Sequence, residues 1–196
     1  MTKTADELVQ HWNSLKSERS SFERTWQDVA DHIRPLRSDF TATRQPGDRR
    51  NRLIFDSTPM MAADNFAGGV FGMMTNPANR WFALKLEDEA LDDYAPARTW
   101  LYDVETRLLS SIGPQVSRFY NAIPALYADL ACFGTAVFSS EEAFADRWRI
   151  LDRCHALADV CIAENALGDV DTVYRRVTIE ARNAPALFGE RLSRDA

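Results

Sequence analysis

The side chains that could bind a metal are few and scattered along the sequence. Cys154, His155 and Cys161 come closest to a ligand set. A structural zinc site also needs closely paired cysteines or a second histidine, and this set has neither. His11 and His32 lie far from any cysteine in the sequence. We therefore expect no metal site and no cofactor.

Two carboxylate pairs could in principle serve as acid and base or hold a cation. They are Glu141 with Glu142 and Asp169 with Asp171. Adjacent acids are common on solvated surfaces, so neither pair indicates a catalytic site by itself. The phosphate-binding patterns GxxxxGK[ST] and GxGxxG and the nucleophile pattern GxSxG are all absent. The sequence thus predicts that the protein is not an enzyme.

The bulk composition is that of an ordinary globular protein. The 196 residues are 45% hydrophobic and 27% charged, which allows either one large domain or a small fold with two portions. The net charge is −6, with the acidic excess after residue 55, so a nucleic-acid-binding surface over the whole protein is not expected. Three cysteines indicate reduced thiols. The apolar run at 66–74 is too short to span a membrane.

An arginine-rich stretch over 34–53 lacks hydrophobic periodicity and includes a Gln-Pro-Gly-Asp turn, so it is expected to be an exposed loop. One hypothesis assigns its basic residues to contact with DNA phosphates or with a neighbouring subunit. The other treats the stretch as a solvated arm or an ion-paired crossover. The candidate contact residues are Arg44, Arg49, Arg50 and Arg52.

The segment 55–86 combines a helix with unusual glycines. Thr58 as a capping hydroxyl and Pro59 at the first helical position predict its start, and a later Asn-Pro pair predicts its end. Gly68, Gly69 and Gly72 fall inside the helix, where each costs about 1 kcal/mol relative to alanine. Close approach of another backbone would offset that cost. The helix is therefore either a tightly packed core element or a component of a subunit interface.

The other elements follow from hydrophobic periodicity. A capping box at 4–7 opens one amphipathic helix of nearly thirty residues that ends at Pro35, a strand covers 80–86, and helices cover 96–111 and 115–133. Pro124 inside the last helix implies a kink or a delayed start. Short strands follow at 135–139, 147–151, 158–164 and 170–181, with a hairpin turn at 164–169 and a final helix near 184–188.

These elements predict an α+β fold in which long N-terminal helices are followed by a small antiparallel sheet. Residues 1–133 form a mainly helical portion with one strand near 80–86, and residues 134–196 form the β portion. We expect the two portions to make one folded unit.

Three ordered stretches stand out in the sequence. The first runs from Asp56-Ser57-Thr58-Pro59 through the small-residue helix to Pro77 and Trp81-Phe82. The second is the Asp-Leu-Ala-Cys-Phe-Gly-Thr-Ala sequence at 129–136, and the third is the hairpin at 162–176. Together they resemble the N-terminal region of the head-to-tail connector, or portal, proteins of short-tailed bacteriophages. Such proteins usually run to several hundred residues, so the resemblance implies a truncated or fragment form.

The resemblance implies a structural role and a place in the wing region of a portal. A portal is a ring, typically of twelve copies, at one vertex of the capsid. Its implied partners are terminase, capsid proteins, tail adaptors and the double-stranded DNA that passes through its channel. The implied locations are the virion and, during assembly, the host cytoplasm, with no membrane span. The alternative is a small α+β nucleic-acid-binding module that uses the loop from Arg44 to Arg52.

Overall fold

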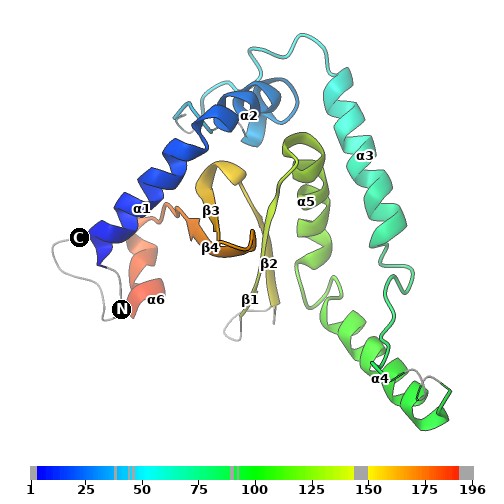
Figure 1. Cartoon of the computed structure of the whole chain (residues 1–196). Coiled ribbons are helices and arrows are strands. Elements are labelled where there is room, and N and C mark those ends of the chain that lie inside the picture. Colours follow the sequence, from blue (N-terminus) through cyan, green and yellow to red (C-terminus); the bar gives the residue numbers. More distant parts are fainter. Residues whose placement is uncertain are drawn as a thin grey trace. The chain divides into compact units, whose positions relative to one another are not determined.

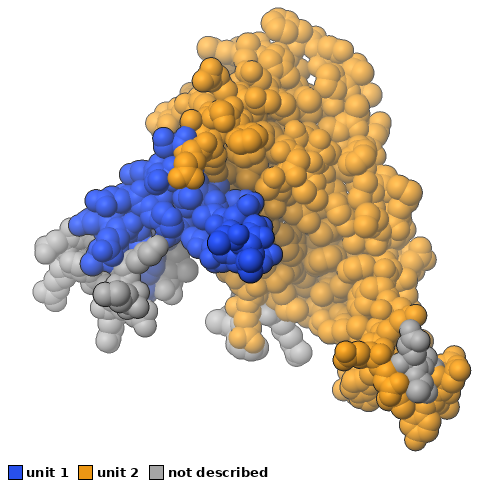
Figure 2. Space-filling view, in the orientation of Figure 1, with its two compact units in different colours: residues 1–17, 159–196 blue, residues 18–158 orange. Residues whose placement is uncertain are grey.

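The computed structural model describes residues 4–37, 39–43, 45, 47–88, 91, 93–143 and 150–189. The chain divides into two compact units, coloured separately in Figure 2. Unit 1 contains residues 1–17 and 159–196, and unit 2 contains residues 18–158. The expected boundary at residue 133 does not coincide with this division. Whether both units fold together stays a prediction.

The predicted long N-terminal helix is two helices, α1 (Ala5–Glu18) and α2 (Ser20–His32) (Figure 1). Arg19 interrupts them with ψ near 1°. Its guanidinium donates to the main-chain carbonyls of Leu157, at 3.2 Å, and Ala158, at 3.0 Å, and to the buried Glu23 carboxylate at 2.8 Å. The single-helix prediction was wrong because the carbonyl partners of Arg19 lie more than a hundred residues away. They leave no trace in local periodicity.

Helix α3 (Thr58–Met74) has the predicted limits, and Pro59 lies in its first turn. The predicted cap was wrong: the N-cap is Ser57, which makes no side-chain capping bond. Asp56 supplies the side-chain hydrogen bonds at this end instead. Its Oδ1 accepts from the main-chain N–H of Thr58 at 3.0 Å and from the Thr58 hydroxyl at 2.8 Å. The Thr58 hydrogen bonds lower the pKa of the Asp56 carboxyl.

No strand forms over 80–86, so that prediction was wrong. The segment keeps the predicted alternation, because Phe82, Leu84 and Leu86 are half-buried and the residues between them are exposed. No strand among the described residues pairs with it. The N–H of Leu84 instead donates to Glu105 Oε1 at 2.7 Å, on helix α4 (Ala95–Ser111), and Trp81 Nε1 donates to the Tyr120 hydroxyl at 3.1 Å.

Helix α5 (Phe119–Phe133) starts four residues later than the predicted 115, and Pro124 lies inside it. It ends at Gly134, whose φ of +71° is left-handed and whose N–H donates to the Leu130 carbonyl at 3.0 Å. Strand β1 (Val137–Glu142) then pairs antiparallel with β2 (Ile150–His155). Residues 147–149 of the predicted second strand lie outside the described residues.

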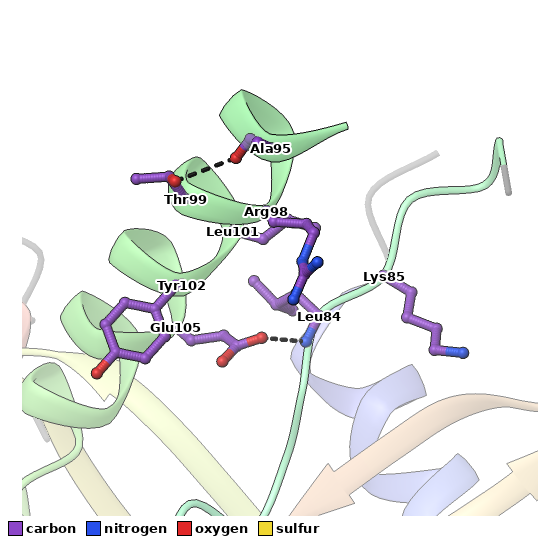
Figure 3. A pocket seen from close by; sticks show the side chains of 8 residues that line it. All are labelled: Leu84, Lys85, Ala95, Arg98, Thr99, Leu101, Tyr102 and Glu105. Carbon is purple, nitrogen blue, oxygen red and sulfur yellow. Dashed lines mark hydrogen bonds between the residues drawn. The ribbon is translucent and has the colours of Figure 1, made fainter. Parts of the chain in front are cut away.

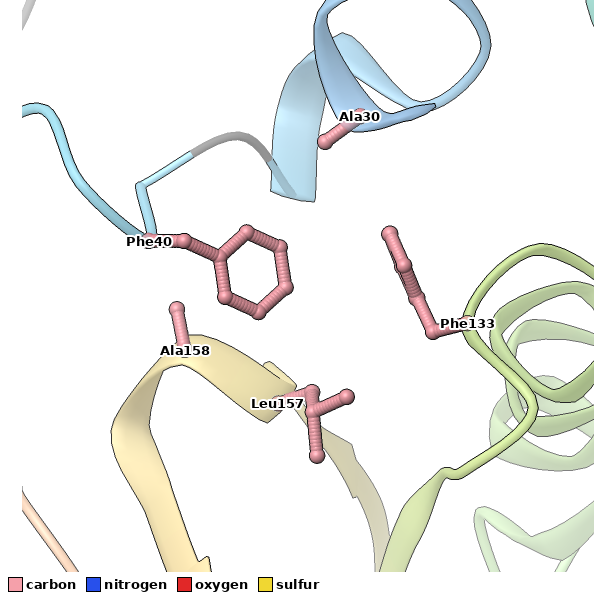
Figure 4. Close-up of a cluster of buried hydrophobic side chains, with 5 residues drawn as sticks. All are labelled: Ala30, Phe40, Phe133, Leu157 and Ala158. Atoms are coloured by element: carbon pink, nitrogen blue, oxygen red, sulfur yellow. The ribbon is translucent and has the colours of Figure 1, made fainter. Parts of the chain in front are cut away.

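The core of unit 2 gathers residues from segments that are distant in the sequence (Figure 4). The Phe40 ring lies 5.4 Å from that of Phe133, with Ala30 of α2 packed in the same cluster. Leu157 and Ala158 of the short 3-10 helix η3 (Leu157–Asp159) complete it. Burial of these side chains holds α2, α5 and η3 together. A second short turn, η1 (Pro35–Arg37), follows α2.

Unit 1 contains a hairpin of β3 (Val160–Glu164) and β4 (Val170–Arg175), followed by η4 (Ala181–Asn183) and α6 (Ala184–Phe188). The two strands are shorter than predicted. His11 Nδ1 of α1 lies 2.9 Å from the Tyr174 hydroxyl of β4. The α+β class is confirmed, although the predicted single sheet is two separate two-stranded sheets.

Candidate assembly surfaces

The described residues contain no group of three or more histidine, cysteine or acidic side chains placed to hold a metal. Of the predicted candidates, Cys154 belongs to unit 2 and Cys161 to unit 1. His155 lies with its Nε2 2.8 Å from the Ser139 hydroxyl, across the β1–β2 hairpin. Within the same described ranges, no helix has the length and apolarity needed to cross a membrane.

Among the residues that the structure describes, the most buried charged group is Asp129, whose side chain is 1% exposed. Arg34 Nη2 lies 2.8 Å from its Oδ1, and Arg37 Nη2 lies 3.2 Å from its Oδ2. Two arginines of the predicted exposed loop thus form ion pairs with a buried carboxylate. The sequence did not predict this cluster. Its only local signal is an aspartate inside an otherwise apolar helical run.

Cys154 adjoins the same cluster. Its Sγ donates to Asp129 Oδ2 at 3.4 Å, and Arg37 Nη2 donates to that sulfur at 3.6 Å. Burial, followed by the Asp129 charge and opposed by Arg37, raises the pKa of the Cys154 thiol to about 11. Burial also raises the pKa of Cys132. Both thiols therefore stay protonated near neutral pH and are unsuited to nucleophilic catalysis.

A second buried carboxylate fixes the start of α5. Ser117 Oγ donates to Asp152 Oδ2, and Ser140 Oγ donates to Asp152 Oδ1 at 2.6 Å. The Ser117 hydroxyl also accepts from the N–H of Phe119, the first residue of α5, at 2.9 Å. Because each polar group has a partner, this network is a structural tie between α5 and the β1–β2 hairpin.

Three of the four candidate arginines come together, and Arg44 lies outside the described residues. A pocket of about 440 Å³ is lined by Asp31, Asp48, Arg49, Arg50, Arg52 and Leu53. Arg50 also forms an ion pair with Asp39, at 3.2 Å, and donates a hydrogen bond to the Pro35 carbonyl at 3.4 Å. The surface is therefore mixed in sign, which is the arrangement that the ion-paired-crossover hypothesis expects.

The three helix glycines face open space. A Cβ built on Gly68, Gly69 or Gly72 would meet nothing within 4 Å. The core-packing hypothesis requires a backbone close to these glycines, and the described residues place none there. The opposite side of α3 packs on α5, with Ala67 buried and the Phe71 ring 6.4 Å from the Tyr120 ring.

Apolar side chains around the glycines on α3 are also solvent-exposed. Met73 is 81% exposed, and Met61, Phe66 and Met74 are each more than half exposed. A cluster of exposed large apolar residues is typical of an interaction surface. That α3 is a subunit interface stays a prediction.

A pocket of about 600 Å³ lies between the segment after Trp81 and α4, and we call it the α4 pocket (Figure 3). Its walls come from Leu84, Lys85, Ala95, Arg98, Thr99, Leu101, Tyr102 and Glu105. The Glu105 carboxylate accepts a hydrogen bond from the Leu84 N–H and forms an ion pair with Arg80 at 3.3 Å. Lys85 and Arg98 form no ion pair with any residue that the structure describes.

Comparison with known proteins identifies the family. The model of a family described as bacteriophage head to tail connecting protein matches residues 5–196. A portal protein of Salmonella phage epsilon15 is 34% identical over 191 residues, which cover 96% of this chain and 34% of the relative. A probable portal protein of Bordetella phage BPP-1 is 32% identical over 186 residues, which cover 93% of this chain and 32% of the relative. The chain spans about a third of the length of these relatives. It belongs to the bacteriophage head-to-tail connecting protein family.

Proposed function

We propose that this chain is a structural subunit, or a segment of such a subunit, of the portal ring through which a phage packages and ejects its DNA. The observation that carries the proposal is the family match over residues 5–196, together with the relatives' description as portal proteins. The role is architectural: the ring supplies a channel of fixed geometry, and a separate motor supplies the energy. In this role the chain's own side chains catalyse no reaction.

The proposed partners are further copies of the chain, twelve in the complete ring, together with capsid protein, terminase and tail adaptors. Double-stranded DNA passes through the channel. The proposed location is the portal vertex of the virion, with assembly in the host cytoplasm. Rings close through heterologous contacts, in which two different patches of each subunit meet. The exposed apolar face of α3, with Gly68, Gly69 and Gly72, supports the proposal as one such patch.

The test is immunogold electron microscopy of phage particles with antibody raised against this chain. We expect label at one vertex of each particle and, after disruption, ring-shaped assemblies that carry the same label. Antibody absorbed with purified chain is the control. Opened particles without label, alongside chain detected free in the lysate, would contradict the proposal.

No observation on the described residues favours the nucleic-acid-binding alternative. Arg50 is paired with Asp39, and the pocket that Arg49 and Arg52 share with it also contains Asp31 and Asp48. An open phosphate-binding surface would instead gather basic groups without interleaved carboxylates.

A further inference from the structure

The tip of the β3–β4 hairpin holds one leucine out into solvent. Leu167 is 87% exposed. The turn that carries it is fixed by Asn165, whose Oδ1 accepts from the N–H groups of Leu167, at 2.8 Å, and Asp169, at 3.1 Å. Gly168 completes the turn with a φ of +86°. Leu167 is therefore presented by a turn that closes its own hydrogen bonds.

The apolar exposure continues from the tip along the strands. Ile162 and Val173 lie directly opposite each other in the register, and both are exposed, as is Val170. A two-stranded hairpin is only marginally stable without a cover for an apolar face. An exposed apolar side chain standing alone is common on protein surfaces, whereas a contiguous set indicates a contact surface.

Acidic side chains surround this apolar set. Glu164, Asp169 and Asp171 flank the tip, and all three are exposed. None of these carboxylates forms an ion pair with a residue in the described ranges. The hairpin tip is thus an apolar knob, centred on Leu167, with a negative collar.

The α4 pocket on unit 2 has the complementary character. Leu84, Leu101 and Ala95 supply apolar lining, and Arg98 reaches from α4 toward Leu84 (Figure 3). Together with Lys85, Arg98 gives the pocket two cations that have no carboxylate partner among the described residues. Its volume, about 600 Å³, falls within the range of about 300–1,000 Å³ typical of small binding sites. A hairpin tip bearing one leucine is of suitable size.

We propose that the Leu167 knob of one copy inserts into the α4 pocket of a second copy. The acidic collar then lies beside Lys85 and Arg98, so the charges match as well as the apolar surfaces. The choice of a second copy rests on the proposed function. Because knob and pocket are different patches, the contact is heterologous and leaves each copy with one free knob or pocket for the next.

Complementation between two disabled variants tests this contact in the full chain. Leu167→Asp removes the knob, and Arg98→Glu reverses the charge of the pocket. We expect the wild-type chain to self-associate in sedimentation velocity as its concentration rises. Each variant alone should associate at least about tenfold more weakly, as loss of a central contact residue does. An equal mixture should form a 1:1 pair that does not grow, because only one intact knob meets one intact pocket.

Two matched variants control for general surface effects. Arg107→Glu reverses another exposed charge on α4, outside the pocket lining. Leu36→Asp changes another leucine, which is 82% exposed. Both should associate as the wild type does. A further variant, Asp169→Arg, should form assemblies larger than a pair when mixed with Arg98→Glu, because the two reversed charges allow a second knob–pocket contact. Circular dichroism and unfolding curves establish that every variant is folded.

Three outcomes would overturn the inference. They are a wild-type chain that stays monomeric at the highest soluble concentration, knob and pocket variants that associate like the wild type, and a mixture that fails to pair. None of these contradicts the proposed function, which is tested by the label on phage particles. Conversely, if phage particles carry no label, the head-to-tail contact between purified copies can still be measured by sedimentation velocity.

Discussion

Arg34 Nη2 lies 2.8 Å from Asp129 Oδ1, which joins the chain just after α2 to the buried face of α5 across 95 residues of sequence. Arg37 adds a second contact to the same carboxylate at 3.2 Å. The start of the predicted exposed loop is thus anchored inside unit 2. The cluster stays stable only while all three charges are present, since each compensates the burial of the others.

Replacement of Asp129 by alanine should lower the free energy of unfolding by about 3–5 kcal/mol, because two largely buried guanidinium groups lose their counter-charge. Urea unfolding monitored by circular dichroism measures the change. Asp39→Asn is the matched control in the same unit. Its pair with Arg50 is partly solvated, with 41% of the Asp39 side chain exposed, and should contribute less than about 1 kcal/mol. Equal losses of unfolding free energy in the two variants would show that the buried Asp129 cluster contributes no more than a solvated ion pair.

The thiol of Cys154 predicts a pH dependence of stability. Its pKa is raised from 9.0 to about 11 in the folded protein, chiefly by burial and then by the Asp129 charge. The folded state therefore binds the thiol proton more tightly than the unfolded chain. This contribution is fully present below pH 9 and is lost as the pH rises from 9 through about 11.

Unfolding curves from pH 8 to pH 11 check this prediction by comparing the wild type with Cys154→Ala. The free energy of unfolding should fall less steeply with pH in the variant, because one titrating group has been removed. Tyrosine and lysine titrations contribute equally to both proteins and cancel in the comparison. Parallel pH profiles would rule out a shifted thiol at this position.

Alanine at Gly68, Gly69 and Gly72 should stabilise the isolated chain. Each new methyl group enters open space, and each glycine costs about 0.5–1 kcal/mol in a helix. Thermal unfolding of the triple variant measures the gain. Gly134→Ala is the opposite control, because its φ of +71° disfavours alanine and should make that variant less stable.

The same triple variant separates stability from assembly. If another subunit's backbone approaches α3, the variant should form rings less readily than the wild type while unfolding at a higher temperature. Gel filtration and negative-stain microscopy of the assembled form measure this. A triple variant that is more stable and assembles normally would remove the glycines from the predicted interface.

The arginine pocket predicts weak attraction for DNA. Because Arg50 is paired and two aspartates share the pocket, we expect this chain not to retain duplex DNA at about 0.15 M salt. Fluorescence anisotropy with a labelled duplex measures retention. Arg49→Gln combined with Arg52→Gln should leave any residual binding at low salt nearly unchanged. Tight, salt-dependent binding that this double variant abolishes would favour the nucleic-acid hypothesis.

Several features could be predicted because their causes are local. Pro59 and the Asn76-Pro77 pair bound α3, and Asn165 with Gly168 forms the hairpin turn as predicted. In each case the residues that determine the backbone conformation lie within a few positions of it. The α+β class follows from the same local signals. So does the family resemblance, whose motif residues include Asp56 at the start of α3.

Other features depended on partners remote in the sequence. The break at Arg19 depends on carbonyl groups of residues 157 and 158. The segment 80–86 forms no strand because no strand in the described part of the chain pairs with it, although the alternation itself was correct. Periodicity reports which face of a segment is buried, but it carries no information about which segment will pair with it.

The sequence alone determined where α3, α4 and the β3–β4 turn lie, and it carried the resemblance to a family of phage connectors. Only the tertiary structure showed that Arg34 and Arg37 form ion pairs with Asp129, that Gly68, Gly69 and Gly72 face open space, and that Lys85 and Arg98 line one pocket. The physical reason is the separation in sequence between the interacting residues. Turns and caps are decided by bonds within one helical turn, whereas ion pairs and pockets form when folding brings distant side chains together.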